Sequence, residues 1–166
     1  FVAIVKARKW SSAKKTEEER FSMRFMILVK ATQDSEAGKM PSPELIQAMM
    51  KYNEELVKAG VLVAADGLHP SSNAIRISYP EPGGKPKITD GPFTETKELI
   101  AGYTMIEVNS REEAIEWALR MPDPHGNGQG EIELRQVFEA PELTDDPELL
   151  AKEAELRKQS EEARKS

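Results

Sequence analysis

The stretch "PSPELIQAMMKYNEELVKAGVLVAADGL", residues 41–68, contains a complete helix pattern followed at once by a strand pattern. Ser42 is a favourable N-cap, Pro43 suits the first helical position, and Gly60 suits the position just past the last turn. Apolar residues at helical spacing form one stripe: Leu45, Met49, Tyr52 and Leu56. Because strand 61–68 starts immediately after the helix, we expect the helix to fold back onto a sheet that contains this strand.

Further strand and helix patterns precede and follow this unit. A nearly continuous apolar run predicts a central strand, and two alternating segments on either side of "PEPGG" predict the arms of a hairpin at a sheet edge. A long apolar segment, a capped amphipathic segment and an alternating segment predict a strand, a helix and a half-buried strand. In chain order these are strand 24–31, hairpin arms 74–79 and 85–90, strand 99–108, helix 110–121 and strand 131–139.

The second helix and the last strand each present an apolar side. Ser110 and Glu113 predict a capping box at the start of the helix. The apolar side of this helix is expected to comprise Ala114, Ile115, Ala118, Leu119 and Met121. In the last strand, strict alternation places four side chains on one face: Ile132, Leu134, Gln136 and Phe138.

Apart from the hairpin, the order of these elements is the split βαβ pattern of a ferredoxin-like α+β fold. Both helices then cover one face of the sheet, and the other face is open. If the open face is apolar, a back-to-back homodimer is the simplest way to cover it. Residues 23–140 are the expected domain, residues 1–22 an extension or linker, and residues 141–166 a charged C-terminal helix that starts at Asp146 and Pro147.

Composition narrows the classes of function. The 166 residues carry a formal net charge of -6 and contain no cysteine, which excludes disulfides, thiolate metal sites and cysteine nucleophiles. An acidic domain without a Lys/Arg stripe is a poor match for a phosphate backbone, so we expect no direct nucleic-acid binding. No apolar run approaches the roughly 20 residues of a membrane span, and we expect a cytoplasmic protein. His69 and His125 are far apart in the sequence, so we expect no metal site and no cofactor.

Three residues near the ends of predicted strands are candidates for acid–base catalysis: Asp90, Asp66 and His69. Asp90 opens an Asp-Gly-Pro turn, where its carboxylate either accepts backbone N–H groups or acts as a base at the mouth of a site. Asp66 and His69 would form a dyad if the chain turns at Gly67, because a carboxylate can fix the tautomer of a histidine. Otherwise His69 is a surface residue before Pro70.

Five further side chains are candidate substrate-binding residues: Lys97, Tyr103, Arg76, Arg135 and Glu95. Glu95 and Lys97 share a face in an extended chain, where they form an exposed ion pair or the lysine anchors a carboxylate substrate. Tyr103 and the two arginines are expected on strands, where they line a cavity or pack against neighbouring strands. Phe93 is expected to seat the Asp-Gly-Pro turn on the core.

Four motifs, "GLHP", "TDGPFTETKELIAGY", "EEAIEWA" and "EIELRQVFE", occur in this order between residues 24 and 139. The combination resembles the DGPF-domain group of the YCII-related superfamily. This resemblance implies a dimeric ferredoxin-like α+β barrel, similar in architecture to muconolactone isomerase, and it implies no particular reaction. Gln136 stands where the family commonly has proline, and His69 stands where the family often has a small residue.

Two functions remain open at this point. The first is small-molecule binding or metal-independent acid–base catalysis of isomerase or lyase type, which rests on the candidate residues near strand ends and on fold analogy. The second is a non-catalytic dimeric module that binds a protein partner or takes part in transcription control. It rests on the charged terminal segments and on the position of some family members beside extracytoplasmic-function sigma factors.

Overall fold

The computed structural model describes residues 22–163, so the expectation for residues 1–21 falls outside the described part of the chain. Four strands form an antiparallel sheet in the order β2-β5-β1-β6, consistent with a ferredoxin-like fold. The strands are β1 (Met23–Lys30), β2 (Leu62–Gly67), β5 (Ile100–Val108) and β6 (Ile132–Gln136).

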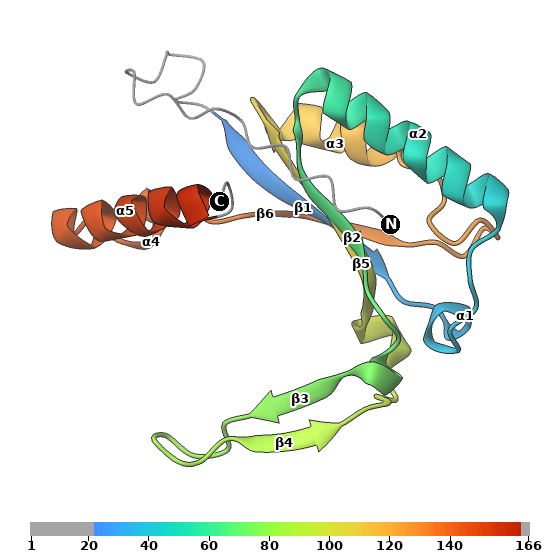
Figure 1. Ribbon diagram of the computed structural model, residues 1–166, viewed down its shortest axis with the longest axis horizontal. Helices are drawn as coiled ribbons and strands as arrows, with labels where there is room; N and C mark the ends of the chain where they lie inside the picture. The colour runs from blue at the N-terminus through green and yellow to red at the C-terminus, as the bar shows by residue number, and fades with distance from the viewer. Residues whose placement is uncertain (1–21, 164–166) are drawn as a thin grey trace.

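Two helices, α2 (Pro43–Ala59) and α3 (Arg111–Arg120), lie on one face of this sheet (Figure 1). The predicted capping residues at both ends of α2 are confirmed. The Ser42 hydroxyl accepts a hydrogen bond from the Leu45 N–H at 3.2 Å, and Gly60 takes the left-handed conformation with φ of 74°. The protein is therefore an α+β protein in which β1, α2 and β2 form the predicted strand, helix and strand.

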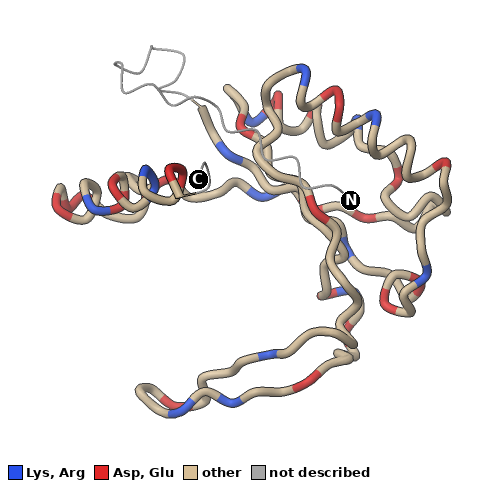
Figure 2. The backbone as a smooth tube through the Cα atoms, viewed as in Figure 1, with Lys and Arg blue, Asp and Glu red and all other residues tan. Residues whose placement is uncertain are grey.

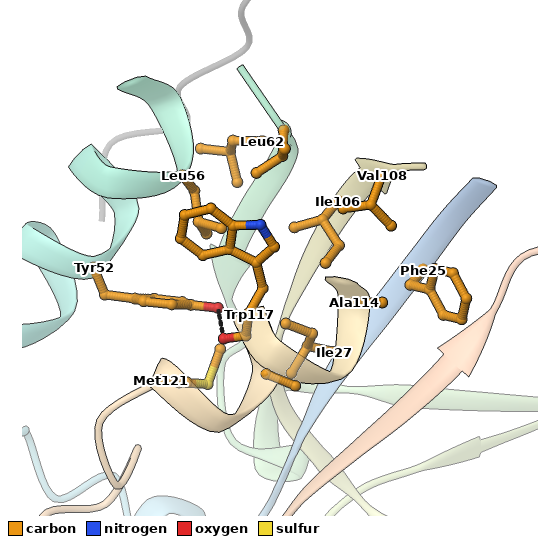
Figure 3. Packing of buried hydrophobic residues seen from close by; sticks show 12 residues of the cluster. Phe25, Ile27, Tyr52, Leu56, Leu62, Ile106, Val108, Ala114, Trp117 and Met121 are labelled. Atoms are coloured by element: carbon orange, nitrogen blue, oxygen red, sulfur yellow. Dashed lines mark hydrogen bonds between the residues drawn. The ribbon is translucent and has the colours of Figure 1, made fainter. Parts of the chain in front are cut away.

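The core fills the space between the helices and the sheet (Figure 3). Strand alternation directs every second side chain of β1 and β5 towards the helices, and burial of these apolar side chains is the main stabilising term. Tyr52 of α2 lies across the core from α3, and its hydroxyl donates to the Trp117 carbonyl oxygen at 2.9 Å. The most completely buried side chains are Ile27, Leu56, Ile106 and Val108.

The buried side of α3 differs from the predicted one. Trp117 is buried, whereas Leu119 is 80% exposed. A rotation of 100° per residue explains the difference, because positions 114, 117, 118 and 121 cluster on one side of the helix and position 119 falls outside that arc. The predicted capping box is half formed: the Ser110 hydroxyl accepts from the Glu113 N–H at 3.1 Å, but the Glu113 carboxylate accepts from the Asn109 N–H at 2.9 Å.

Strand β6 ends earlier than the alternation predicted. Ile132 and Leu134 pack against the core, but Gln136 is exposed and Phe138 is 68% exposed. The chain leaves the sheet here, because α4 (Ala140–Leu143) begins directly afterwards. Glu139 joins this exit to β1 through an ion pair with Arg24, with a separation of 2.8 Å between Oε1 and Nε.

The C-terminal helix α5 (Pro147–Ala163) has no buried residue. Its leucines Leu149 and Leu156 are more than half exposed, and acidic and basic residues are interspersed along it (Figure 2). In Figure 1, α5 projects from the side of the sheet opposite to α2 and α3. No helix within residues 22–163 has the length and hydropathy required to cross a membrane.

A separate two-stranded sheet lies between β2 and β5 along the chain. Strands β3 (Ile75–Ser78) and β4 (Lys87–Asp90) pair antiparallel, and every residue of both strands is exposed. The base of this hairpin rests on a close approach of two backbones. The Gly91 N–H donates to the Ala74 carbonyl oxygen at 2.9 Å, and a Cβ at Gly91 would lie 1.8 Å from the Ser71 carbonyl oxygen.

Replacing Gly91 with alanine should therefore detach the base of the hairpin. The added methyl group cannot share space with the Ser71 carbonyl, and we expect a loss of roughly 1–3 kcal/mol in the free energy of unfolding. Urea unfolding and hydrogen exchange of the β3 and β4 amides measure the loss. Gly84→Ala is the control, since a Cβ at Gly84 meets its nearest atom, Glu81 Cβ, at 3.2 Å. Equal unfolding midpoints and equal protection in the two variants would contradict this account.

Burial of Tyr52 raises the pKa of its hydroxyl to about 12. Below pH 10 the hydroxyl keeps its proton in both the folded and the unfolded state, so the contribution of Tyr52 to stability is fully present there. Above pH 10 the unfolded chain releases the proton first, and stability should fall by about 2–3 kcal/mol by pH 12. Urea unfolding across this range tests the effect. At pH 8, Tyr52→Phe should be less stable than wild type by about 1 kcal/mol, because the hydrogen bond to Trp117 is lost. Its stability should also fall less steeply above pH 10. Identical pH profiles of the two proteins would refute the raised pKa of Tyr52.

Candidate functional site

A pocket of about 290 Å³ opens at the end of the sheet where β2 ends and β5 begins. Three chain segments that are distant in sequence meet there: residue 36, residues 68–74 and residues 93–100. Glu36 ends the short helix α1 (Gln33–Glu36), His69 follows β2, and Ser71 begins the short helix η2 (Ser71–Asn73). Apolar side chains form much of the remaining wall: Leu68, Phe93, Leu99 and Ile100.

Glu36 and Ser71 hold these segments together. The Ser71 N–H donates to both carboxylate oxygens of Glu36 at 3.2 Å, and the Ser71 hydroxyl donates to Glu36 Oε2. The same hydroxyl accepts a hydrogen bond from the Phe93 N–H at 3.0 Å. Ser71 is only 6% exposed, so its hydroxyl is a structural linker whose donor and one acceptor position are already used. This linker fixes α1, η2 and the turn before β5 in one arrangement.

Neither Glu36 nor Ser71 is among the residues that the sequence singles out. Thr32 caps α1 through a hydrogen bond from the Ser35 N–H to its hydroxyl, at 3.2 Å, and this local signal could have located the short helix. The contact between Glu36 and Ser71 spans 35 positions. No local pattern encodes a contact of that range, so only the folded chain shows that the two residues meet.

His69 lies in the pocket wall, and its side chain makes no hydrogen bond to another residue within 22–163. The proposed dyad partner, Asp66, interacts elsewhere. Asp66 pairs with Tyr103 across β2 and β5, and the Tyr103 hydroxyl donates to Asp66 Oδ2 at 3.1 Å. This hydrogen bond, together with burial and the charge of Asp66, raises the pKa of Tyr103. The structure therefore brings Asp66 to Tyr103 and forms no Asp66–His69 dyad. His69 is an exposed residue before Pro70, as in the alternative interpretation, and it borders the pocket.

Arg76 of β3 does not line the pocket itself but contacts Phe93, which does. Its guanidinium carbon lies over the Phe93 ring, 3.9 Å from the ring centroid. Phe93 was expected to seat the turn on the core, but it is absent from the buried core cluster and lines the pocket instead. The Phe93 N–H donates to the Ser71 hydroxyl, so the backbone is anchored without burial of the ring. The ring contacts the Arg76 guanidinium instead of the core.

The Asp90 turn is stabilised differently from its predicted form. Asp90 is the last residue of β4 and pairs with Ile75, but its carboxylate caps no N–H group within the described residues. Ala74 and Ser71 accept the turn's N–H groups instead. The peptide bond between Gly91 and Pro92 is cis.

The other predicted polar residues lie apart from the pocket. Lys97 is exposed in the short helix η3 (Thr96–Glu98), and within the described chain it forms no ion pair with Glu95. The chain turns at η3, so Glu95 and Lys97 do not share a face as they would in an extended strand. Arg135 is exposed on β6, and its Nε lies 3.6 Å from Glu133 Oε1.

The second histidine has a structural position. His125 Nε2 lies 2.8 Å from the Lys30 carbonyl oxygen, and the backbone N–H groups of His125 and Gly128 donate to the Asp123 carboxylate. These hydrogen bonds lower the pKa of Asp123. Among residues 22–163 no three His, Asp or Glu side chains converge closely enough to hold a metal ion.

Comparison with known proteins confirms the resemblance at the level of the superfamily. The sequence pattern of the YCII-related domain matches residues 23–141, which is most of the chain. A related protein, an uncharacterized protein of Rhizobium meliloti (strain 1021), is 26% identical over 107 residues; the match covers 64% of this chain and 85% of that protein. On the extent of this match, the chain belongs to the YCII-related domain family.

Proposed function

We propose that this chain binds a small organic molecule in the pocket beside β2 and β5, and that His69 transfers a proton to or from it. The observation that carries the proposal is the pairing of a histidine with an apolar wall in one pocket. Histidine is the side chain that most readily accepts and returns protons near neutral pH. The side chain of His69 is exposed and forms no hydrogen bond with another described residue, so its ring nitrogens are available to a ligand.

The chemistry that this arrangement supports is proton transfer at a carbon acid. A neutral imidazole removes a proton from carbon, and the imidazolium returns it at another position or assists loss of a leaving group. These are isomerase and lyase reactions. Glu36 does not compete for the role of base, because Ser71 donates two hydrogen bonds to its carboxylate. The apolar wall offers a surface on which the body of the ligand packs.

Replacing His69 with glutamine should remove proton transfer and leave binding nearly intact. The measurement is deuterium incorporation in D2O into small ketones, lactones and keto acids, with binding followed by NMR shifts of the Phe93 and Leu99 amides. We expect wild type to exchange such a carbon acid and the variant to be slower by a factor of roughly 10²–10⁴.

His125→Gln is the matched control, since His125 contacts the Lys30 carbonyl oxygen rather than the pocket. Equal exchange by wild type and His69→Gln would eliminate His69 as the acid–base group. A folded protein that exchanges no carbon acid at all would favour the second function, a non-catalytic dimeric module. The observation on which that module rests is α5, a 17-residue helix with no buried side chain.

We also propose that a second copy of the chain covers the sheet face opposite to α2 and α3. Cross-strand pairs identify the side chains on this face: Met26 with Met105, Leu28 with Tyr103, and Asp66 with Tyr103. Around this apolar centre lie charges of both signs, including the cross-strand neighbours Arg24 and Glu107. A surface with an apolar centre and mixed charges at its rim can pair with itself about a two-fold axis.

The hairpin supports the same proposal. An isolated two-stranded sheet is marginal in water, yet β3 and β4 are exposed on both faces. One face carries an apolar row whose members are about half exposed or more: Ile75, Ile77, Tyr79 and Ile88. In Figure 1 the hairpin and α5 extend on the same side of the sheet, where a second copy would sit. Such a copy would also enclose Asp66 and Tyr103.

A charge at the centre of this face should prevent dimer formation. We expect wild type to have twice the chain mass of 18.6 kDa in sedimentation equilibrium, and Met105→Arg to have the single-chain mass. Leu119→Arg is the control, because Leu119 is exposed on the helix side. If Met105→Arg does not fold, Ile77→Arg on the hairpin gives the same test. A single-chain mass for wild type at tens of micromolar would overturn the proposal.

A further inference from the structure

We propose that the ligand of the pocket is a small organic carboxylate and that Arg76, stacked on Phe93, binds its carboxylate group. This inference rests on the pocket assigned above and adds the chemical class of its ligand. The pocket-lining residues include no lysine or arginine, and the guanidinium of Arg76 on β3 lies over the ring of one of them, Phe93. Its place over the Phe93 ring is a specific contact, 3.9 Å from the centroid.

Stacking prepares Arg76 for this role. A guanidinium held over an aromatic ring still presents N–H donors at its edge, and the planar fork of these donors matches the two oxygens of a carboxylate. Arg76 forms no ion pair and no hydrogen bond with another side chain in the described part of the chain. Its charge is therefore available, in contrast to Arg24 and Arg120, which pair with Glu139 and Glu55.

The acidic residue of the pocket does not neutralise this charge. Glu36 points its carboxylate at Ser71, which donates hydrogen bonds to both oxygens. Glu36 keeps its negative charge and disfavours an anion beside it, so the attraction of the unpaired Arg76 guanidinium must exceed this repulsion. Without such a cation, the net charge of -6 would repel an anion, so recognition requires a local positive group.

The remaining wall selects the body of the ligand. Leu68, Leu99 and Ile100 offer apolar surface, and the volume of about 290 Å³ lies at the lower end of ligand pockets. A small acid with an apolar or aromatic body fits both features. Binding its carboxylate at Arg76 would orient the rest of the molecule along the wall that contains His69.

The test compares benzoate with its neutral analogue benzamide, by NMR titration of the full chain. We expect wild type to bind benzoate more tightly by roughly five- to tenfold, with shifts at the amides of His69, Phe93 and Leu99. Arg76→Gln should remove this preference and leave benzamide binding unchanged. Arg76→Lys should keep part of it, because a lysine retains the charge and loses the planar fork. Arg135→Gln, at an exposed strand arginine that pairs with Glu133 on β6, is the control and should behave as wild type.

Each outcome decides the inference. Equal affinity of wild type for the two probes, a preference that survives Arg76→Gln, or no binding of either probe would overturn it. Circular dichroism and urea unfolding first show that Arg76→Gln is folded, and Thr89→Ala, at the cross-strand partner of Arg76, checks that a change in the hairpin alone has no effect. The acid–base proposal fails separately: benzoate would still bind through Arg76, but His69→Gln would leave deuterium exchange unchanged.

Discussion

Burial of only one face of the four-stranded sheet is the constraint on which the other features depend. Helices α2 and α3 cover that face, so along β5 the residues Thr104, Ile106 and Val108 are buried while their neighbours are only partly buried. Strand alternation then sends Tyr103 and Met105 to the opposite face. A sheet covered on one side has a core on that side and a candidate interface on the other. The Asp66–Tyr103 pair belongs to the second surface because of this alternation.

The pocket depends on a second, smaller constraint, the contact of Ser71 with the turn that precedes β5. Gly91 permits that contact because no side chain fits between it and the Ser71 carbonyl oxygen. The Ser71 hydroxyl then links Glu36 to the Phe93 backbone. One buried serine thus holds the segments that bring His69 and Phe93 to the pocket, and Arg76 stacks on Phe93. The proposed chemistry uses groups that this linker positions, while the linker itself takes no part in it.

The hairpin connects the two surfaces. Its base carries Arg76, which stacks on the pocket residue Phe93, and its apolar row is about half exposed or more. Arg76 and Ile77 are neighbours on β3, so alternation directs them to opposite faces of the ribbon. A second copy that packs on Ile77 would therefore also steady the arm that holds Arg76. In this arrangement, dimer formation and ligand binding would share one structural element.

Local propensity, periodicity and contiguous motifs are enough to predict the α+β class, the order of the core elements, the helix caps at Ser42 and Gly60, and the YCII-related family. The predicted apolar side of α3 wrongly included Leu119, and the predicted last strand, 131–139, was longer than β6. Hydrophobic periodicity within one segment does not show which side of that segment the neighbouring elements cover. Three contacts are visible only in the folded chain: Glu36 with Ser71, Asp66 with Tyr103, and Arg76 with Phe93. These contacts join residues 17 to 37 positions apart. They exist only after the strands have paired and one sheet face has been buried.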